Sequence, residues 1–96
     1  MSYSLRFKES AKKEWDRLDS VIREQFTRKL RERRDNPRVE SARLTGMPDC
    51  YKIKLRAAGF RLVYEVRDHA VVIVVIAVGK RERNAVYKVA ARRLVE

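Results

Sequence analysis

The apolar positions near the start of the chain change their period from two residues to between three and four. Apolar and polar side chains alternate over residues 3–7, which predicts a short strand. From Glu9 onward the apolar residues recur at helical spacing, which predicts a helix that ends near Asp19 and Ser20. A second helix follows and ends before Asn36-Pro37, because the residue before a proline avoids the helical conformation. Its outer face is predicted to be basic, through Arg23, Arg28, Lys29, Arg31, Arg33 and Arg34.

The second half of the chain has the pattern of a sheet. Residues 51–56 and 60–67 alternate on either side of Ala57-Ala58-Gly59, which predicts a hairpin. Residues 71–78 are continuously apolar, as in a central strand covered on both faces. A basic loop then leads to a last helix from about Asn84. The order β-α-α-β-β-β-α predicts a single small α+β domain over residues 1–96, with a predominantly antiparallel sheet, an N-terminal helical hairpin and a C-terminal helix.

Composition adds a strong positive charge. The 96 residues include 24 Lys and Arg against 13 Asp and Glu, a formal net charge of +11. Such an excess favours a polyanionic partner, with nucleic acid first and a membrane surface second. The longest apolar run, residues 70–78, is about half of the roughly 20 residues that span a bilayer, and residues 1–10 lack the apolar stretch of a secretory signal. We therefore expect a cytoplasmic protein that does not cross a membrane.

Metal and disulfide chemistry have little support in the sequence. Cys50 and His69 are the single cysteine and the single histidine of the chain, so an internal disulfide is excluded and a cluster of metal ligands is not expected. We expect no metal and no small-molecule cofactor. Cys50 is interpreted as an incidental thiol, His69 as a turn residue and Trp15 as core.

One face of the predicted hairpin gathers cations. Lys52, Lys54 and Arg56 point the same way on one strand, and Arg61 shares that face on the next. Like charges opposite each other destabilise paired strands, so such a face indicates an anion site, although alternation alone more often reflects a solvated surface. Six more cations follow and would complete a basic groove: Lys80, Arg81, Arg83, Lys88, Arg92 and Arg93. Tyr87 lies among them and could stack on a base, take a proton, or simply pack its helix.

RNA is a substrate on which such residues can act, because its 2′-hydroxyl can attack the neighbouring phosphate. The reaction needs a proton acceptor, cations for the phosphorane and a proton donor for the 5′ oxygen. A histidine pair is absent from this chain. Lysine and tyrosine are poor bases at their ordinary pKa, but neighbouring cations lower the pKa of both. The residues alone do not decide between Lys52, Lys54 and Tyr87 for the proton steps.

Three segments carry a resemblance to a known family. Residues 46–56, 59–64 and 78–83 resemble the RelE toxins of bacterial toxin–antitoxin pairs, in the RelE/ParE superfamily, and the similarity runs over essentially the whole chain. The resemblance implies a RelE-like fold, related to the microbial ribonucleases. It implies a ribosome-dependent endoribonuclease that works without metal, cuts messenger RNA in the ribosomal A site and stops translation. It also implies contacts with ribosomal RNA and a RelB-like antitoxin that covers the basic face.

The resemblance also implies the site residues. The matching motif positions hold the catalytic cluster Lys52, Lys54, Arg61, Arg81 and Tyr87. The two arginines are expected to contact the transition state or leaving group, the lysines to stabilise charge or carry protons, and Tyr87 to stack or accept a proton. Further RNA contacts are predicted from Arg56, Lys80 and Arg83.

Two other functions fit the same sequence. A basic protein could bind ribosomal or messenger RNA and block translation without cutting it. A toxin of the same fold could instead poison DNA gyrase, although the complete cationic cluster argues against this. Arg81→Ala separates cutting from binding, and the appearance of messenger ends or DNA breaks separates the two toxins.

Overall fold

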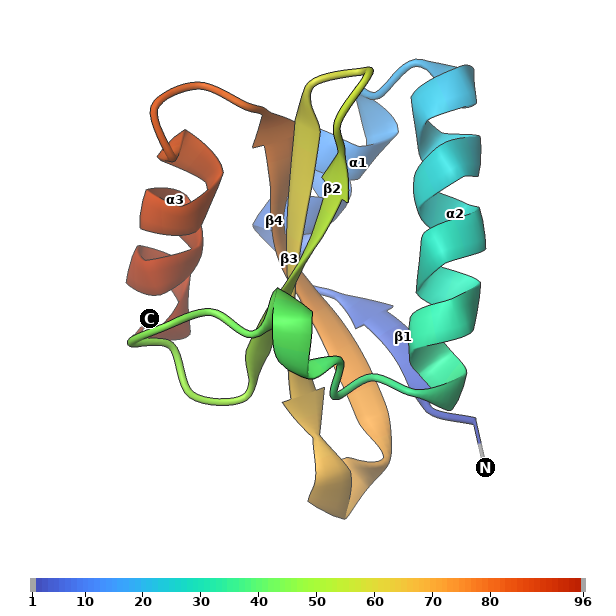
Figure 1. Ribbon diagram of the computed structural model, residues 1–96, viewed down its shortest axis with the longest axis vertical. Helices are drawn as coiled ribbons and strands as arrows, with labels where there is room; N and C mark the ends of the chain where they lie inside the picture. Colours follow the sequence, from blue (N-terminus) through green and yellow to red (C-terminus); the bar gives the residue numbers. More distant parts are fainter. Residues whose placement is uncertain (1, 96) are drawn as a thin grey trace.

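The computed structural model describes residues 2–95, and it confirms the predicted order of elements (Figure 1). The first helix, however, ends three residues earlier than predicted, at Asp16. The strands are β1 (Ser4–Phe7), β2 (Cys50–Leu55), β3 (Phe60–Arg67) and β4 (Val72–Lys80). The helices are α1 (Glu9–Asp16), α2 (Ser20–Asp35) and α3 (Ala85–Leu94), with short 3₁₀ turns at Glu40–Ala42 and Asp68–Ala70.

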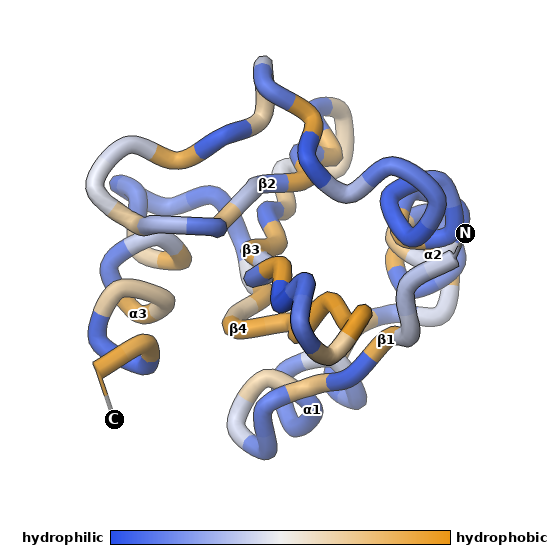
Figure 2. Tube along the Cα trace, turned by 90° about the horizontal axis from the view of Figure 1, so that it is seen from below, coloured by the Kyte–Doolittle hydropathy of each residue, from blue (hydrophilic) through white to orange (hydrophobic). Residues whose placement is uncertain are grey.

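The four strands form one mixed sheet in the order β1-β4-β3-β2. β1 runs parallel to β4, whereas β2–β3 and β3–β4 are antiparallel. The prediction of a predominantly antiparallel sheet is therefore confirmed. β4 lies between two neighbours and is buried over residues 72–78, as its continuous apolar run predicted. In Figure 2 the apolar colour is strongest along β4, whereas α2 is largely hydrophilic.

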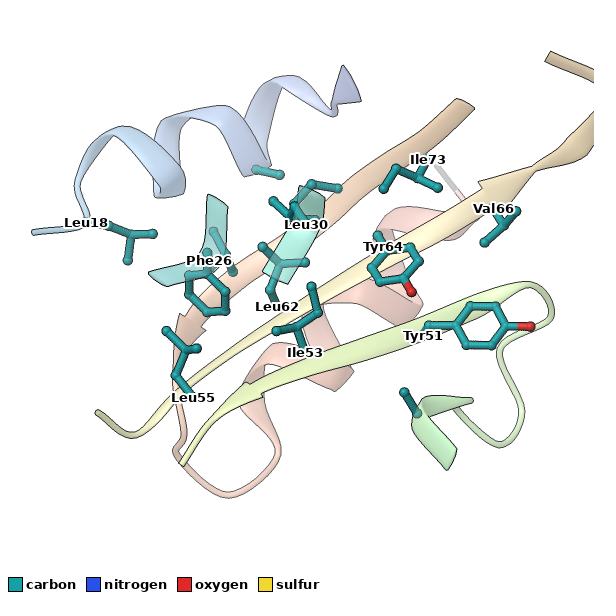
Figure 3. Packing of buried hydrophobic residues seen from close by; sticks show 14 residues of the cluster. Leu18, Phe26, Leu30, Tyr51, Ile53, Leu55, Leu62, Tyr64, Val66 and Ile73 are labelled. Atoms are coloured by element: carbon teal, nitrogen blue, oxygen red, sulfur yellow. The ribbon is translucent and has the colours of Figure 1, made fainter. Parts of the chain in front are cut away.

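Helices cover the sheet on both faces. Phe26 and Leu30 of α2 pack with Ile53, Leu62 and Tyr64 of the sheet (Figure 3). On the other face, Val86 and Ala90 of α3 pack on a second cluster of sheet residues. α2 and α3 therefore lie on opposite sides of the sheet (Figure 1).

Two arginines of α2 do not lie where the sequence predicted them. Arg33 Nη1 donates to the carbonyl of Lys52 at 3.0 Å and to the hydroxyl of Tyr64 at 2.9 Å, and Arg34 Nε donates to the carbonyl of Tyr3 at 2.7 Å. Both follow the buried Leu30 by three or four residues, so they share its side of the helix. Their long aliphatic stems extend along the core, and their guanidinium groups reach backbone carbonyls at the two opposite edges of the sheet. The exposed cations of α2 are Arg28, Lys29 and Arg31.

Val71, in the turn between β3 and β4, has a backbone conformation that disfavours its side chain. Its φ of 51° and ψ of 50° are left-handed, which costs an L-residue about 1–2 kcal/mol, and its side chain is 38% exposed. Asparagine adopts this conformation more readily. We expect Val71→Asn to raise the free energy of unfolding by about 1 kcal/mol in urea unfolding. The matched change Val21→Asn, at an exposed helical position, should stay within about 0.5 kcal/mol, and a similar gain there would contradict the strain argument.

Candidate active site

The β2–β3 hairpin places three of the predicted site residues on one sheet face. Lys54 lies directly opposite Arg61 in the antiparallel register, and Lys52 lies two residues earlier on the same face. Gly59 closes the hairpin with a φ of 74°, and its N–H donates to the carbonyl of Leu55 at 2.8 Å. The cationic face predicted from alternation is therefore present.

Arg61 is the charged side chain that the fold buries. It is 7% exposed, and among residues 2–95 it is the only charged residue in the buried class. Its guanidinium donates to the carbonyl of Phe60 at 2.9 Å, but no carboxylate within the described chain pairs with it. A buried cation is costly unless an anion compensates it. Arg61 beside Lys54 therefore forms a preformed site for an anion.

The basic loop after β4 brings Arg81 to the hairpin. The Arg81 N–H donates to the carbonyl of Gly59 at 2.7 Å, so the loop is fixed to the turn that precedes Arg61. Arg83 and Asn84 then adopt left-handed conformations, with φ of 45° and 61°, and turn the chain into α3. The reversal places α3 over the sheet face that carries Arg61.

A pocket of about 100 Å³ lies where the hairpin, the basic loop and α3 meet. Its lining residues are Lys54, Arg61, Lys80, Arg81, Glu82, Asn84, Ala85, Val86 and Tyr87. The hydroxyl of Tyr87 is buried and finds no hydrogen-bond partner among residues 2–95. An unpaired buried hydroxyl loses free energy unless a ligand satisfies it. The pocket lining therefore combines cations with a tyrosine whose hydroxyl has no partner in the described chain.

The cations influence one another through space. The pKa of Lys54 lies below its ordinary value, chiefly because of the charge of Lys52, followed by partial burial and the charges of Arg56, Arg61 and Arg81. A lowered pKa makes Lys54 a better proton acceptor near neutral pH than an ordinary lysine.

The same repulsion predicts a dependence of stability on pH. Between the lowered pKa of Lys54 and its ordinary value of 10.5, the unfolded chain binds more protons than the folded protein. Stability from this group therefore rises as pH increases through that window, and below it the repulsion is fully present. We expect Lys54→Met to raise the melting temperature at pH 7, with a smaller gain at pH 10.5. Lys29→Met, at an exposed position on α2, is the control, and an equal gain there would show that the effect is not specific to the cluster.

Most of the predicted site residues are brought together. Lys54, Arg61, Arg81 and Tyr87 line the pocket with Lys80, and Lys52 stands beside it on β2. Arg56 lies in the hairpin turn rather than on the strand, yet its charge still contributes to the lowered pKa of Lys54. Arg83 is exposed and outside the pocket lining.

Two polar residues of the pocket lining are not among the site residues predicted from the sequence. They are Glu82, which has no predicted role, and Asn84, which is predicted only as the start of the last helix. Their place in the basic segment was the one signal that could have indicated them.

The residues to which the sequence analysis gave no role in the site are absent from the pocket lining. His69 is exposed in the turn after β3, and Arg61 is at the opposite end of that strand. Burial raises the pKa of the Cys50 thiol to about 12, so it is protonated at neutral pH. Trp15 packs against Phe7 and Phe26, with ring centroids 5.2 and 6.2 Å away.

Among the described helices, none combines the length and the apolar character that crossing a membrane requires.

Comparisons with known proteins agree with this geometry. The sequence model of the family described as ParE toxin of type II toxin-antitoxin system, parDE, matches residues 5–85. The mRNA interferase toxin RelE of Escherichia coli strain K12 is 56% identical over 95 residues, which are 99% of this chain and 100% of that protein. A mutant of E. coli toxin RelE, solved in the free state, is 54% identical with a TM-score of 0.90, over 98% of this chain and 99% of that one. RelE in the intact E. coli RelBE toxin-antitoxin complex is 57% identical with a TM-score of 0.82, over 85% of this chain and 100% of that one. The chain therefore belongs to the ParE toxin family of type II toxin–antitoxin systems, and within it to the RelE-type toxins.

Proposed function

We propose that this protein is an mRNA interferase, an endoribonuclease that cuts messenger RNA in the A site of the ribosome and so inhibits translation. The observation that carries the proposal is Arg61, a buried cation without a carboxylate partner in the described chain. It lies opposite Lys54, and both line a pocket to which Tyr87 also contributes. The relative named mRNA interferase toxin RelE, at 56% identity, supports the same activity. The 96 residues are proposed to act as one toxin domain.

The proposed reaction uses the nucleophile within RNA. The 2′-hydroxyl gives its proton to the deprotonated form of Tyr87 or of a lysine and attacks the adjacent phosphorus, and the bond from phosphorus to the 5′ oxygen breaks. The departing 5′ oxygen takes a proton from a protonated lysine as it leaves, so the products are a 2′,3′-cyclic phosphate and a new 5′-hydroxyl. The charge that develops on the phosphorane is proposed to be stabilised by Arg61, Arg81 and Lys52, which line or adjoin the pocket.

The ribosome is proposed to supply what the pocket lacks. No histidine lies in the pocket lining, so the proton acceptor is weaker than in a histidine-based ribonuclease. Holding the 2′-oxygen in line with the departing 5′ oxygen can lower the activation free energy, by about 7–11 kcal/mol in the best intramolecular cases. A codon held in the A site provides that alignment, and it also places the proposed activity in the cytoplasm.

A RelB-like antitoxin is the proposed partner that silences the activity. The similarity to RelE in the RelBE complex supports this partnership. The exposed cations around the pocket suit an acidic segment.

Mapping messenger 5′ ends after brief induction tests the proposed function. We expect new 5′-hydroxyl ends within codons of translated messengers, and none when translation is blocked before elongation. Translation arrest without new ends would instead support a non-catalytic RNA-binding protein. DNA breaks that precede arrest would support a gyrase poison of the same fold.

A further inference from the structure

The end of β4 that carries the pocket has a free edge. β1 pairs with β4 only as far as Val75, whereas β4 continues to Lys80. Unpaired backbone groups on an edge need other partners. Here Glu14 of α1 accepts a hydrogen bond from the N–H of Val78 at 3.3 Å, and Arg93 of α3 donates to the carbonyl of Ile76 at 2.8 Å.

The two side chains that satisfy this edge also bind each other. Arg93 Nη1 and Nη2 donate to Glu14 Oε1 and Oε2 at 2.7 and 3.0 Å, an end-on bidentate pair. The Arg93 side chain is 14% exposed and that of Glu14 is 31% exposed, so the pair is partly shielded from water. The Lys8 ammonium donates a further hydrogen bond to the carbonyl of Arg93 at 2.8 Å. A positive charge at this place also stabilises the helix, because the C-terminal end of a helix dipole is negative. The last turn of α3 is therefore held by α1, by β4 and by the segment between β1 and α1.

The first turn of α3 is held much less firmly by polar contacts. Asn84 at its N-cap makes no side-chain capping bond, and residues 81–85 are exposed. Tyr87 lies in this first turn and is one of the residues that line the pocket. Val86 and Ala90 pack this helix on the sheet, and the directional contacts of the helix with β4 and α1 lie in its last turn.

We propose that Glu14 and Arg93 are positioning residues, which hold α3 so that Tyr87 stays in register with Arg61 and Lys54. The proposal rests on the proposed function and adds a part of the molecule outside the pocket to it. Arg93 lies six positions after Tyr87, which is about 9 Å along a helix. A rigid helix transmits a shift at its last turn to its first, and a misplacement of about 1 Å at a reacting group can lower a rate about 100-fold.

The test is a double-mutant cycle with Tyr87, measured as single-turnover cleavage on programmed ribosomes. We expect Arg93→Ala to lower the rate at saturating toxin by about 10-fold or more, with the half-saturating concentration nearly unchanged. In a Tyr87→Phe background the same change should have little further effect, because the group that it positions has already been lost. Arg93→Lys, which keeps the charge but loses the planar bidentate fork, should recover part of the rate. Lys13→Ala, an exposed cation on α1 beside Glu14, is the charge-matched control.

Equal losses in both backgrounds, or a loss confined to the half-saturating concentration, would overturn the proposal. If the wild-type protein does not cleave RNA, the proposed function is refuted, and the positioning role is then tested by a second measurement that needs no cleavage. In the free protein, the ring resonances of Tyr87 should shift in Arg93→Ala and Glu14→Gln and stay in place in Lys13→Ala. Unchanged resonances in folded Arg93→Ala would also overturn the positioning role.

Discussion

Replacing Arg81 by alanine is expected to lower the rate of messenger cleavage about 10²–10³-fold, while binding to the ribosome is largely retained. Removing one preorganised donor to the charge of a transition state typically has this effect. Arg81 fits that role because its backbone is fixed to the hairpin at Gly59 and its side chain lines the pocket beside Arg61. Cleavage on programmed ribosomes and co-sedimentation with ribosomes measure the two quantities separately.

The control for Arg81→Ala removes an equal charge elsewhere. Arg6 is exposed on β1, at the edge of the sheet opposite to β2. Arg6→Ala should keep the wild-type cleavage rate. If Arg81→Ala also kept it, with binding intact, Arg81 would have no part in the chemistry.

Tyr87→Phe is expected to lower the cleavage rate at saturation about 100-fold, near the lower end of the range for general acid–base groups. The change keeps the ring and removes only the hydroxyl, which is buried and has no partner in the described chain. The half-saturating concentration should change little, because stacking and packing by the ring remain. Single-turnover kinetics measure both quantities.

Tyr3→Phe is the matched control, because the hydroxyl of Tyr3 bonds Asp68 at 2.7 Å in the turn after β3. It should leave cleavage unchanged. A Tyr87→Phe protein with wild-type kinetics, together with a Tyr87→Ala protein that binds RNA more weakly, would assign the ring to stacking and the proton step to a lysine.

The pocket was predicted largely from local periodicity. A strand sends alternate side chains to one face, so Lys52 and Lys54 had to lie together whatever the rest of the fold. The length of the hairpin loop then set Lys54 against Arg61. Both relations involve neighbours in sequence, and a pattern of residues is sufficient to predict them.

Other parts of the site depend on contacts between distant segments. The burial of Arg61 and the unpaired hydroxyl of Tyr87 exist only because α3 folds back over the sheet. Arg33 and Arg34 looked like solvent-facing charges, since a helical pattern does not show how far a long side chain reaches.

The order of the elements, the central strand and the cationic face follow from the sequence by itself, because period and burial pattern are local properties of the chain. Tertiary structure alone decided that β1 lies parallel to β4 and covers only part of its edge. It also decided that Glu14 and Arg93, 79 residues apart, meet at the remaining edge. Such pairings depend on which backbone groups the assembled sheet leaves unsatisfied, and that is settled only once all the strands are in place.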